Sequence, residues 1–134
     1  MEYITKTRVK DASRLNFLPL FTGKYFMQYE QLIYRKLLEA SQGQYDGGYW
    51  DYYTLSNGGF FMELDSQTRF NMQCIDNGYS GQMSAEAASL GVNLCIQNLF
   101  AWEINAQIYS KHYYQLRAYA IEHDEAAEIL GFID

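Results

Sequence analysis

The sequence has little proline and little cysteine, and it has no long apolar run. Its 134 residues include one proline and two cysteines, while 49% are hydrophobic. Such a composition excludes a low-complexity or disordered chain and a disulfide-based scaffold. No apolar stretch approaches the ~18 residues of a membrane-spanning helix, and the polar start of the chain does not resemble a signal peptide. We therefore expect one soluble domain in the cytoplasm.

Patterns that bind cofactors or metals are also missing. Cys74 and Cys95 have no CxxC neighbour, and His112 and His123 are not spaced as metal ligands. The glycine pairs of the chain do not have the spacing of a phosphate-binding loop. We expect no cofactor, no metal and no catalytic residues.

Positive charge is scarce in most of the chain. Residues 1–45 hold seven Lys or Arg and four Asp or Glu, whereas residues 46–134 hold three and twelve, so the two parts carry +3 and −9. An acidic body repels phosphates, which predicts no strong DNA binding beyond a weak role for the basic residues near the N-terminus.

Aromatic residues are abundant, and they are densest between Gly47 and Met62. Residues 49–55 and 60–64 have the composition of strands, and the Ser-Asn-Gly-Gly run between them favours a tight turn. The sequence therefore predicts a β-hairpin whose rings form core, contact surface or both.

Periodicity predicts an α+β fold for the remainder. The pattern indicates one four-stranded antiparallel meander packed with about four helices, in the order α-β-β-β-β-α-α-α. Pro19 favours an extended lead-in, and we expect residues 1–14 to be a flexible tail before a single domain at 15–134. The expected helices cover 24–41, 85–106, 108–122 and a short stretch after Asp124, and the expected strands cover 49–55, 60–64, 69–75 and 79–83.

Two alternatives to a simple binding protein remain open. Asp51 and Glu63 would face each other if the hairpin has the expected register, and a small enzyme could use these carboxylates or a histidine. The many tyrosines would also suit a structural interaction module, since Tyr is enriched at protein interfaces. The sequence leaves the oligomeric state open.

Several phrases resemble the ArdB/KlcA family of antirestriction proteins. They begin with Asn-Phe-Leu-Pro at 16–19 and continue with Gly-Gly-Tyr-Trp-Asp-Tyr-Tyr at 47–53 and Leu-Ser-Asn-Gly-Gly-Phe-Phe-Met at 55–62. Asn-Gly-Tyr-Ser-Gly at 77–81, Ser-Ala-Glu-Ala-Ala at 84–88 and the final Ile-Asp complete the match. The likeness runs in order from about residue 15 to the end.

The resemblance implies a small cytoplasmic α+β protein of conjugative plasmids, prophages or genomic islands. Such a protein relieves type I restriction of incoming plasmid or phage DNA, and its partner would be the restriction enzyme complex or a host factor acting on it. The family provides no catalytic motif to carry over. From the hairpin and the final residue we select candidate contact residues: Trp50, Asp51, Tyr53, Asn57 and Asp134.

The charge argues against DNA mimicry as the mechanism. A mimic needs about one negative charge per 1.7 Å of duplex axis, or about 24 over 40 Å. The chain carries −6. We therefore expect a contact surface or an indirect route to the restriction enzyme.

Overall fold

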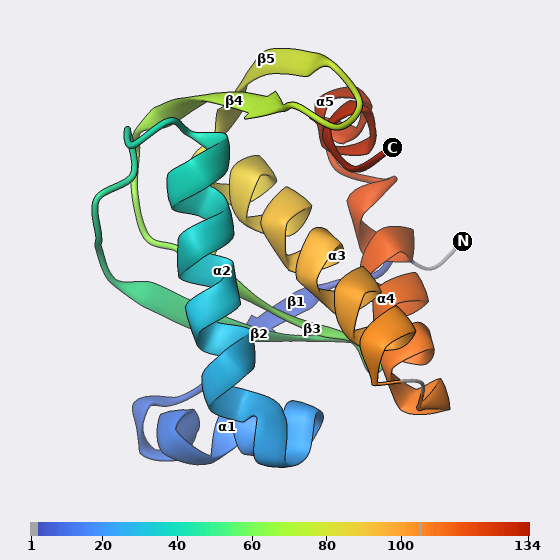
Figure 1. The fold of residues 1–134 in the computed structure, drawn as a ribbon. Coiled ribbons are helices and arrows are strands. Elements are labelled where there is room, and N and C mark those ends of the chain that lie inside the picture. Colours follow the sequence, from blue (N-terminus) through green and yellow to red (C-terminus); the bar gives the residue numbers. More distant parts are fainter. Residues whose placement is uncertain (1–2, 105) are drawn as a thin grey trace.

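The computed structural model describes residues 3–104 and 106–134 and has the predicted α+β class (Figure 1). Two short 3-10 turns, Asp11–Ser13 and Gly23–Tyr25, flank the first helix. The other elements are β1 (Lys6–Arg8), α1 (Arg14–Thr22), α2 (Phe26–Ala40), β2 (Trp50–Leu55), β3 (Phe60–Leu64), β4 (Arg69–Cys74), β5 (Tyr79–Ser84), α3 (Ala85–Glu103), α4 (Gln107–Ala120) and α5 (Ala126–Ile133).

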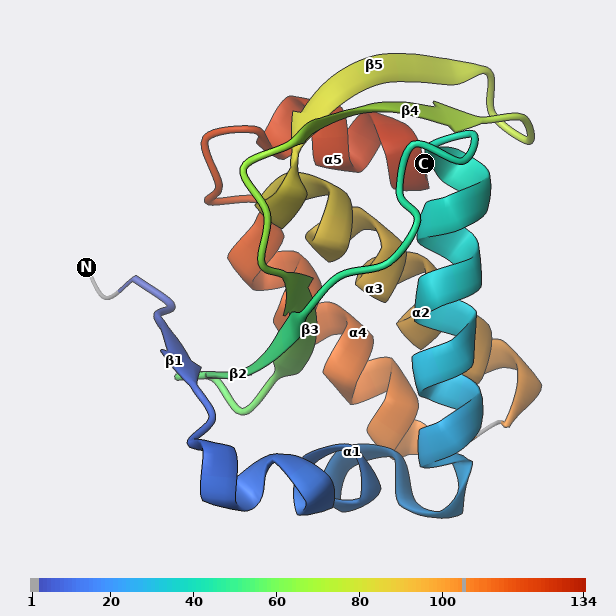
Figure 2. The ribbon, with the colours of Figure 1, turned by 90° about the vertical axis from the view of Figure 1, so that its left-hand side faces the viewer.

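The strands form two sheets, so the prediction of one four-stranded meander is wrong. One sheet has the order β1-β2-β3, the other is the β4-β5 hairpin, and all pairs are antiparallel. Figure 2 shows the β4-β5 hairpin over one end of α3, with α5 lying alongside the hairpin and the three-stranded sheet beside α4. Helix α3 contacts β3, β5, α2, α4 and α5, which makes it the centre of the fold.

Polar side chains of α3 explain why β3 and β4 do not pair. Ser89, Asn93 and Gln97 are buried and lie four residues apart on one face of the helix, and we call them the polar ladder. Their side chains hydrogen-bond the edge of β3 that a fourth strand would pair with. The backbone N–H and C=O groups of this edge therefore have partners although no strand lies beside it. The bonds run from Leu64 N–H to Ser89 Oγ (3.0 Å), from Met62 N–H to Asn93 Oδ1 (3.1 Å), from Asn93 Nδ2 to Met62 O (2.7 Å) and from Gln97 Nε2 to Phe60 O (3.0 Å).

Residues 6–8 belong to the sheet, within the stretch 1–14 for which the sequence predicts a flexible tail; residues 1 and 2 of that stretch lie outside the described residues. Strand β1 pairs with β2 in the register Lys6↔Leu55 and Arg8↔Tyr53. The N–H of Val9 donates to Tyr52 O at 2.8 Å, which extends the ladder by one residue. Ion pairs of Lys6 and Arg8 with the body supply the ordering contacts that composition alone did not reveal.

Residues 15–21 are helical, although Pro19 predicted an extended segment. Pro19 lies inside α1. The helix buries Phe17 and Leu18, which are 4% and 3% exposed. Tertiary packing of these side chains overrides the local preference of the residue before proline. In the part of the chain that the structure describes, no helix is both long and apolar enough to span a membrane.

Candidate functional site

The hairpin formed by β2 and β3 lies mainly in the core. Trp50, Phe60 and Phe61 are 4%, 1% and 0% exposed, whereas Tyr49 is 52% exposed. Tyr52 and Tyr53 are half-buried. The aromatic residues therefore stabilise the fold first, and only their polar edges and Tyr49 are available to a partner.

Trp50 packs against two tyrosines, Tyr34 and Tyr45, that line a hollow between α2 and the segment after it. Its indole N–H donates to Tyr45 Oη at 3.1 Å, and its ring centroid lies 5.7 Å from that of Tyr34. The hollow has a volume of about 580 Å³, and its lining consists of Gln31, Tyr34, Arg35, Leu38, Tyr45 and Asp46. We call it the aromatic hollow.

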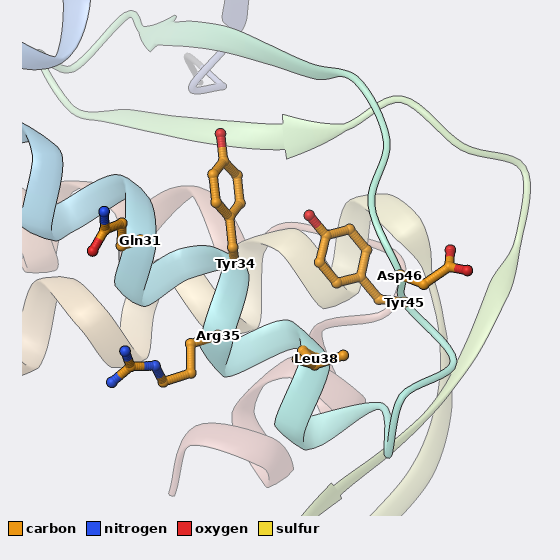
Figure 3. A pocket seen from close by; sticks show the side chains of 6 residues that line it. All are labelled: Gln31, Tyr34, Arg35, Leu38, Tyr45 and Asp46. Atoms are coloured by element: carbon orange, nitrogen blue, oxygen red, sulfur yellow. The ribbon is translucent and has the colours of Figure 1, made fainter.

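The polar groups of the aromatic hollow lie at its rim. Figure 3 shows the Tyr34 and Tyr45 rings projecting to the same side of α2, while Arg35 and Asp46 point outward in different directions. Tyr34 donates its hydroxyl hydrogen to Glu30 at 2.5 Å, and burial raises the pKa of this tyrosine above its ordinary value. The tyrosine therefore stays protonated, and the hollow is suited to an apolar group.

Asp51 and Tyr53 lie on a different surface, a half-buried face of the three-stranded sheet that also carries the buried Phe61. Asp51 is directly opposite Glu63, and Tyr53 is opposite Phe61, so these side chains share one face. The predicted juxtaposition of Asp51 and Glu63 is confirmed. We use the name charged face for this surface, which comprises Lys6, Arg8, Asp51, Tyr53, Glu63 and Glu86.

Basic side chains from the start of the chain neutralise the charged face. Lys6 Nζ lies 2.7 Å from Glu63 Oε1 and also donates to Glu86, in the first turn of α3. Arg8 Nη1 lies 3.6 Å from Asp51 Oδ1, and Arg14 Nη1 lies 3.9 Å from the same oxygen. The Lys6 ammonium also sits 4.4 Å from the centroid of the Tyr53 ring. These pairs explain how the like-charged Asp51 and Glu63 are tolerated opposite each other.

The two glutamates of the charged face have opposite pKa shifts. Burial raises the pKa of Glu63 above its ordinary value, although Lys6 opposes the shift. The hydrogen bond from His123 lowers the pKa of Glu86 to about 2, with a further contribution from Lys6. The same bond, 2.5 Å from His123 Nε2 to Glu86 Oε1, raises the pKa of His123.

A smaller hollow adjoins Glu86 and His123. Its volume is about 290 Å³, and it is lined by Tyr3, Ile4, Glu86, Tyr119, Glu122, His123 and Asp124. Titratable groups from separate elements meet here, which is the arrangement that the enzyme alternative requires. However, both oxygens of the Glu86 carboxylate already have hydrogen-bond partners, Lys6 and His123, within the protein. Among the described residues, no group of three or more His, Cys, Asp or Glu is arranged to hold a metal ion.

Asn57 has a structural position in the hairpin turn. Its side-chain oxygen accepts from Gly59 N–H at 3.0 Å, and its amide donates to Gln115 O at 2.9 Å. Gln115 returns a bond from Nε2 to Asn57 O at 2.7 Å. The turn is thereby fixed to α4, a role that the Asn-Gly signal at the turn suggested only in part.

Asp134 lies apart from the other candidates. It follows α5, and its carboxylate is 3.8 Å from Arg117 Nη2 of α4. The structure thus brings Asp51 and Tyr53 together on the charged face and leaves Trp50, Asn57 and Asp134 elsewhere. Sequence reasoning missed Lys6, Glu86 and His123, because their proximity depends on long-range contacts between β1, α3 and the segment after α4.

Comparison with known proteins supports the resemblance seen in the sequence. Residues 43–134 match the antirestriction protein family. The antirestriction protein KlcA of Escherichia coli is 38% identical over 136 residues, which cover 98% of this chain and 95% of the relative. YafX of Escherichia coli K12 is also 38% identical, over 98% of this chain and 88% of the relative.

A solved structure of the KlcA and ArdB proteins has the same fold. It superposes with a TM-score of 0.90 at 35% identity and covers 100% of this chain and 99% of the other. Those proteins are described as having a novel fold and antirestriction activity against type I DNA restriction systems in vivo but not in vitro.

Proposed function

This chain belongs to the antirestriction protein family, and we propose that it relieves type I restriction of incoming DNA inside the cell. The observation that carries the proposal is the whole-chain likeness to KlcA in sequence and to the KlcA and ArdB structure in fold. The motifs that carry the likeness span both sheets and α3, so the similarity is not confined to one element.

We further propose that the mechanism is non-catalytic and does not involve DNA mimicry. The net charge of −6 is far below that of a phosphate mimic of similar length. In addition, Asp51, Glu63 and Glu86 are each paired with a basic side chain of the same molecule. Charges paired in this way do not present an array of negative groups spaced like phosphates.

The test of the function compares restriction in cells with restriction by purified components. Unmodified phage is plated on a host with a type I system, with and without expression of this protein. Expression should raise plating efficiency toward that of a restriction-deficient host, and it should not change the plating of phage that already carries the host modification. No relief in cells would overturn the proposal.

The purified assay then separates a direct from an indirect route. The relatives of known structure act in vivo but not in vitro. We therefore expect DNA cleavage by the purified restriction enzyme to continue when this protein is added, and to be inhibited only after a cell extract is supplied. Inhibition by the pure protein alone would make the restriction enzyme complex itself the direct partner.

A small enzyme is the second candidate function, and the hollow beside Glu86 and His123 favours it. The substitution His123→Gln discriminates between the two, because glutamine keeps a hydrogen-bond donor but cannot act as a general base. A non-catalytic protein should retain protection in cells with this change. Loss of protection by a variant that folds normally would support the enzyme.

We place the protein in the cytoplasm of a host of plasmids or phages, where type I restriction acts.

A further inference from the structure

The β2-β3 hairpin has one edge covered by side chains of α3 and one edge covered by the short strand β1. The polar ladder occupies the far edge of β3. On the other side, β2 is covered by the three residues of β1. An additional strand can therefore pair with β2 only if β1 opens.

The segment that covers β2 buries little surface. None of the residues 3–10 is buried, and only Ile4, Lys6 and Val9 are half-buried. Ile4 and Val9 touch the core only in part, and the segment is held mainly by backbone bonds, such as Ser56 N–H to Thr5 O at 2.9 Å, and by the ion pairs of Lys6 and Arg8. Segments with few apolar contacts open at a lower cost than the core of a protein, and here the half-buried ion pairs of Lys6 are the main contacts that oppose the opening.

Opening of β1 would uncover a surface of defined chemistry. The backbone groups of Tyr52 and Ser56 that now bond β1 would become available. Glu63 and Glu86 would lose the ammonium of Lys6, and Asp51 would lose Arg8, while Arg14 would stay beside Asp51 and His123 beside Glu86. The surface would then combine a strand edge with three carboxylates, while residues 46–134 carry −9 overall.

Strand β1 itself shows which sequence fits this surface. Its Lys-Thr-Arg sequence places two basic side chains on alternate residues, and alternate residues of a strand point to one face. Both side chains therefore reach the carboxylates while the backbone pairs with β2. Extended peptides bind exposed sheet edges in this mode, with backbone bonds for affinity and alternate side chains for specificity.

We propose that the charged face is a docking surface for a basic extended segment of a partner protein, which pairs with β2 in place of β1. The segment has Lys or Arg at two alternate positions. This inference does not depend on the antirestriction function, because peptide binding is measured without any restriction readout.

The test uses the full chain and a fluorescein-labelled peptide with the sequence of residues 3–9, Tyr-Ile-Thr-Lys-Thr-Arg-Val. In the double variant Lys6→Gln, Arg8→Gln, the internal competitor is weakened while the carboxylates remain. Fluorescence anisotropy should show about tenfold tighter binding to this variant than to the unchanged protein, the ratio expected for loss of two partly exposed ion pairs. The matched control Lys111→Gln removes an exposed charge of α4 and should leave binding at the level of the unchanged protein.

Further variants assign the binding to the charged face. Adding Glu63→Gln or Asp51→Asn to the double variant should weaken binding, and circular dichroism verifies that each variant folds. A peptide with Glu in place of Lys and Arg should not bind. The proposal is overturned if the basic peptide fails to bind the double variant, if the acidic peptide binds equally well, or if neither carboxylate substitution has an effect. It is also overturned if sedimentation shows a dimer that exchanges β1 between two copies, since the occupant would then be a second copy of this chain.

Discussion

Glu86 connects three segments of the chain through single side chains. It accepts hydrogen bonds from Lys6 of β1 and from His123 after α4, and it lies in the first turn of α3. A carboxylate at this position is also favoured by the helix dipole. One residue therefore helps to hold the start of the chain and the segment after α4 against the central helix.

The bond between His123 and Glu86 should make stability depend on pH. The pKa of His123 is raised, so its contribution is complete below the ordinary value of 6.5 and is lost as pH rises through the raised value. The pKa of Glu86 is lowered to about 2, so its contribution is complete above 4.5 and is lost as pH falls toward 2. The pair is therefore strongest between pH 4.5 and 6.5.

We expect His123→Gln to lower the free energy of unfolding by about 1 kcal/mol in that window and by less at about pH 9. Urea unfolding followed by circular dichroism measures the difference. Glu103→Gln changes an exposed residue at the end of α3 and serves as the control. A loss that is the same at both pH values would contradict the role given to the ion pair.

At the scale of elements, the polar ladder replaces a strand by a helix. Asn93 is the central residue, because it bonds both the N–H and the C=O of Met62 and also accepts from the Tyr29 hydroxyl at 2.7 Å. All these groups are buried. Because they are buried, these groups cannot hydrogen-bond water when one partner is removed. Removal of the Asn93 side chain therefore costs the full desolvation penalty of the groups left unpaired.

Asn93→Ala should therefore destabilise the protein by about 3 kcal/mol, since two buried backbone groups lose their partners. Asn98→Ala, at an exposed position of the same helix, should change stability by less than about 0.5 kcal/mol. Both values come from urea unfolding. Equal effects of the two substitutions would show that the ladder does not stabilise β3.

The docking of the β2-β3 turn on α4 can be tested by comparing two glycines with positive φ, Gly58 in this turn and Gly43 after α2. A Cβ at Gly58 (φ +94°) would lie 2.8 Å from Gln115 Nε2, whereas a Cβ at Gly43 (φ +82°) would meet nothing within 4 Å. Gly43→Ala should cost about 1 kcal/mol through backbone strain alone. Gly58→Ala should cost more, because Gln115 must also move. Equal unfolding free energies for the two variants would contradict the docking of the turn on α4.

Most elements were predictable, because hydrophobic periodicity and turn residues are local properties. The hairpin of residues 50–64 and the central helix after Ser84 are examples, and Ser84 caps that helix by accepting from Ala87 N–H at 3.1 Å. The separation into two sheets was not predictable, since Asn93 and Gln97 read as ordinary polar positions of a helix. Nor was β1, whose order depends on carboxylates that lie more than fifty residues away in sequence, such as Glu63.

The candidate site was predicted in part for the same reason. The pairing of Asp51 with Glu63 followed from the hairpin register, which a two-strand pattern specifies. The burial of Trp50 and the positions of Glu86 and His123 depend on how separate elements pack. No spacing within the sequence reports such contacts.

At the scale of the whole molecule, the uneven charge is organised in space. The basic side chains of Lys6, Arg8 and Arg14 lie against carboxylates of the body, which offset their positive charge toward phosphates. The remaining surface of residues 46–134 is acidic. The molecule as a whole should therefore repel nucleic acid.

We expect binding to duplex DNA weaker than the ~10⁻⁴ M dissociation constant at the weak end of the non-specific range at physiological salt. An electrophoretic mobility shift or anisotropy titration with labelled duplex measures it. The double variant Lys6→Gln, Arg8→Gln should bind no more strongly, since it is more acidic. Tight, salt-sensitive binding by the unchanged protein would contradict the assignment of these basic residues to internal ion pairs.

The polar ladder also has a consequence for synthesis of the chain on the ribosome. Strand β3, with its Phe-Phe-Met sequence, is made before the helix that satisfies its edge, and Gln97 follows Leu64 by 33 positions. During that interval the edge carries unpaired backbone groups beside apolar side chains, a combination that favours aggregation. Nascent or truncated chains that end before α3 should therefore associate with one another or require a chaperone, whereas release of the complete helix ends this exposure.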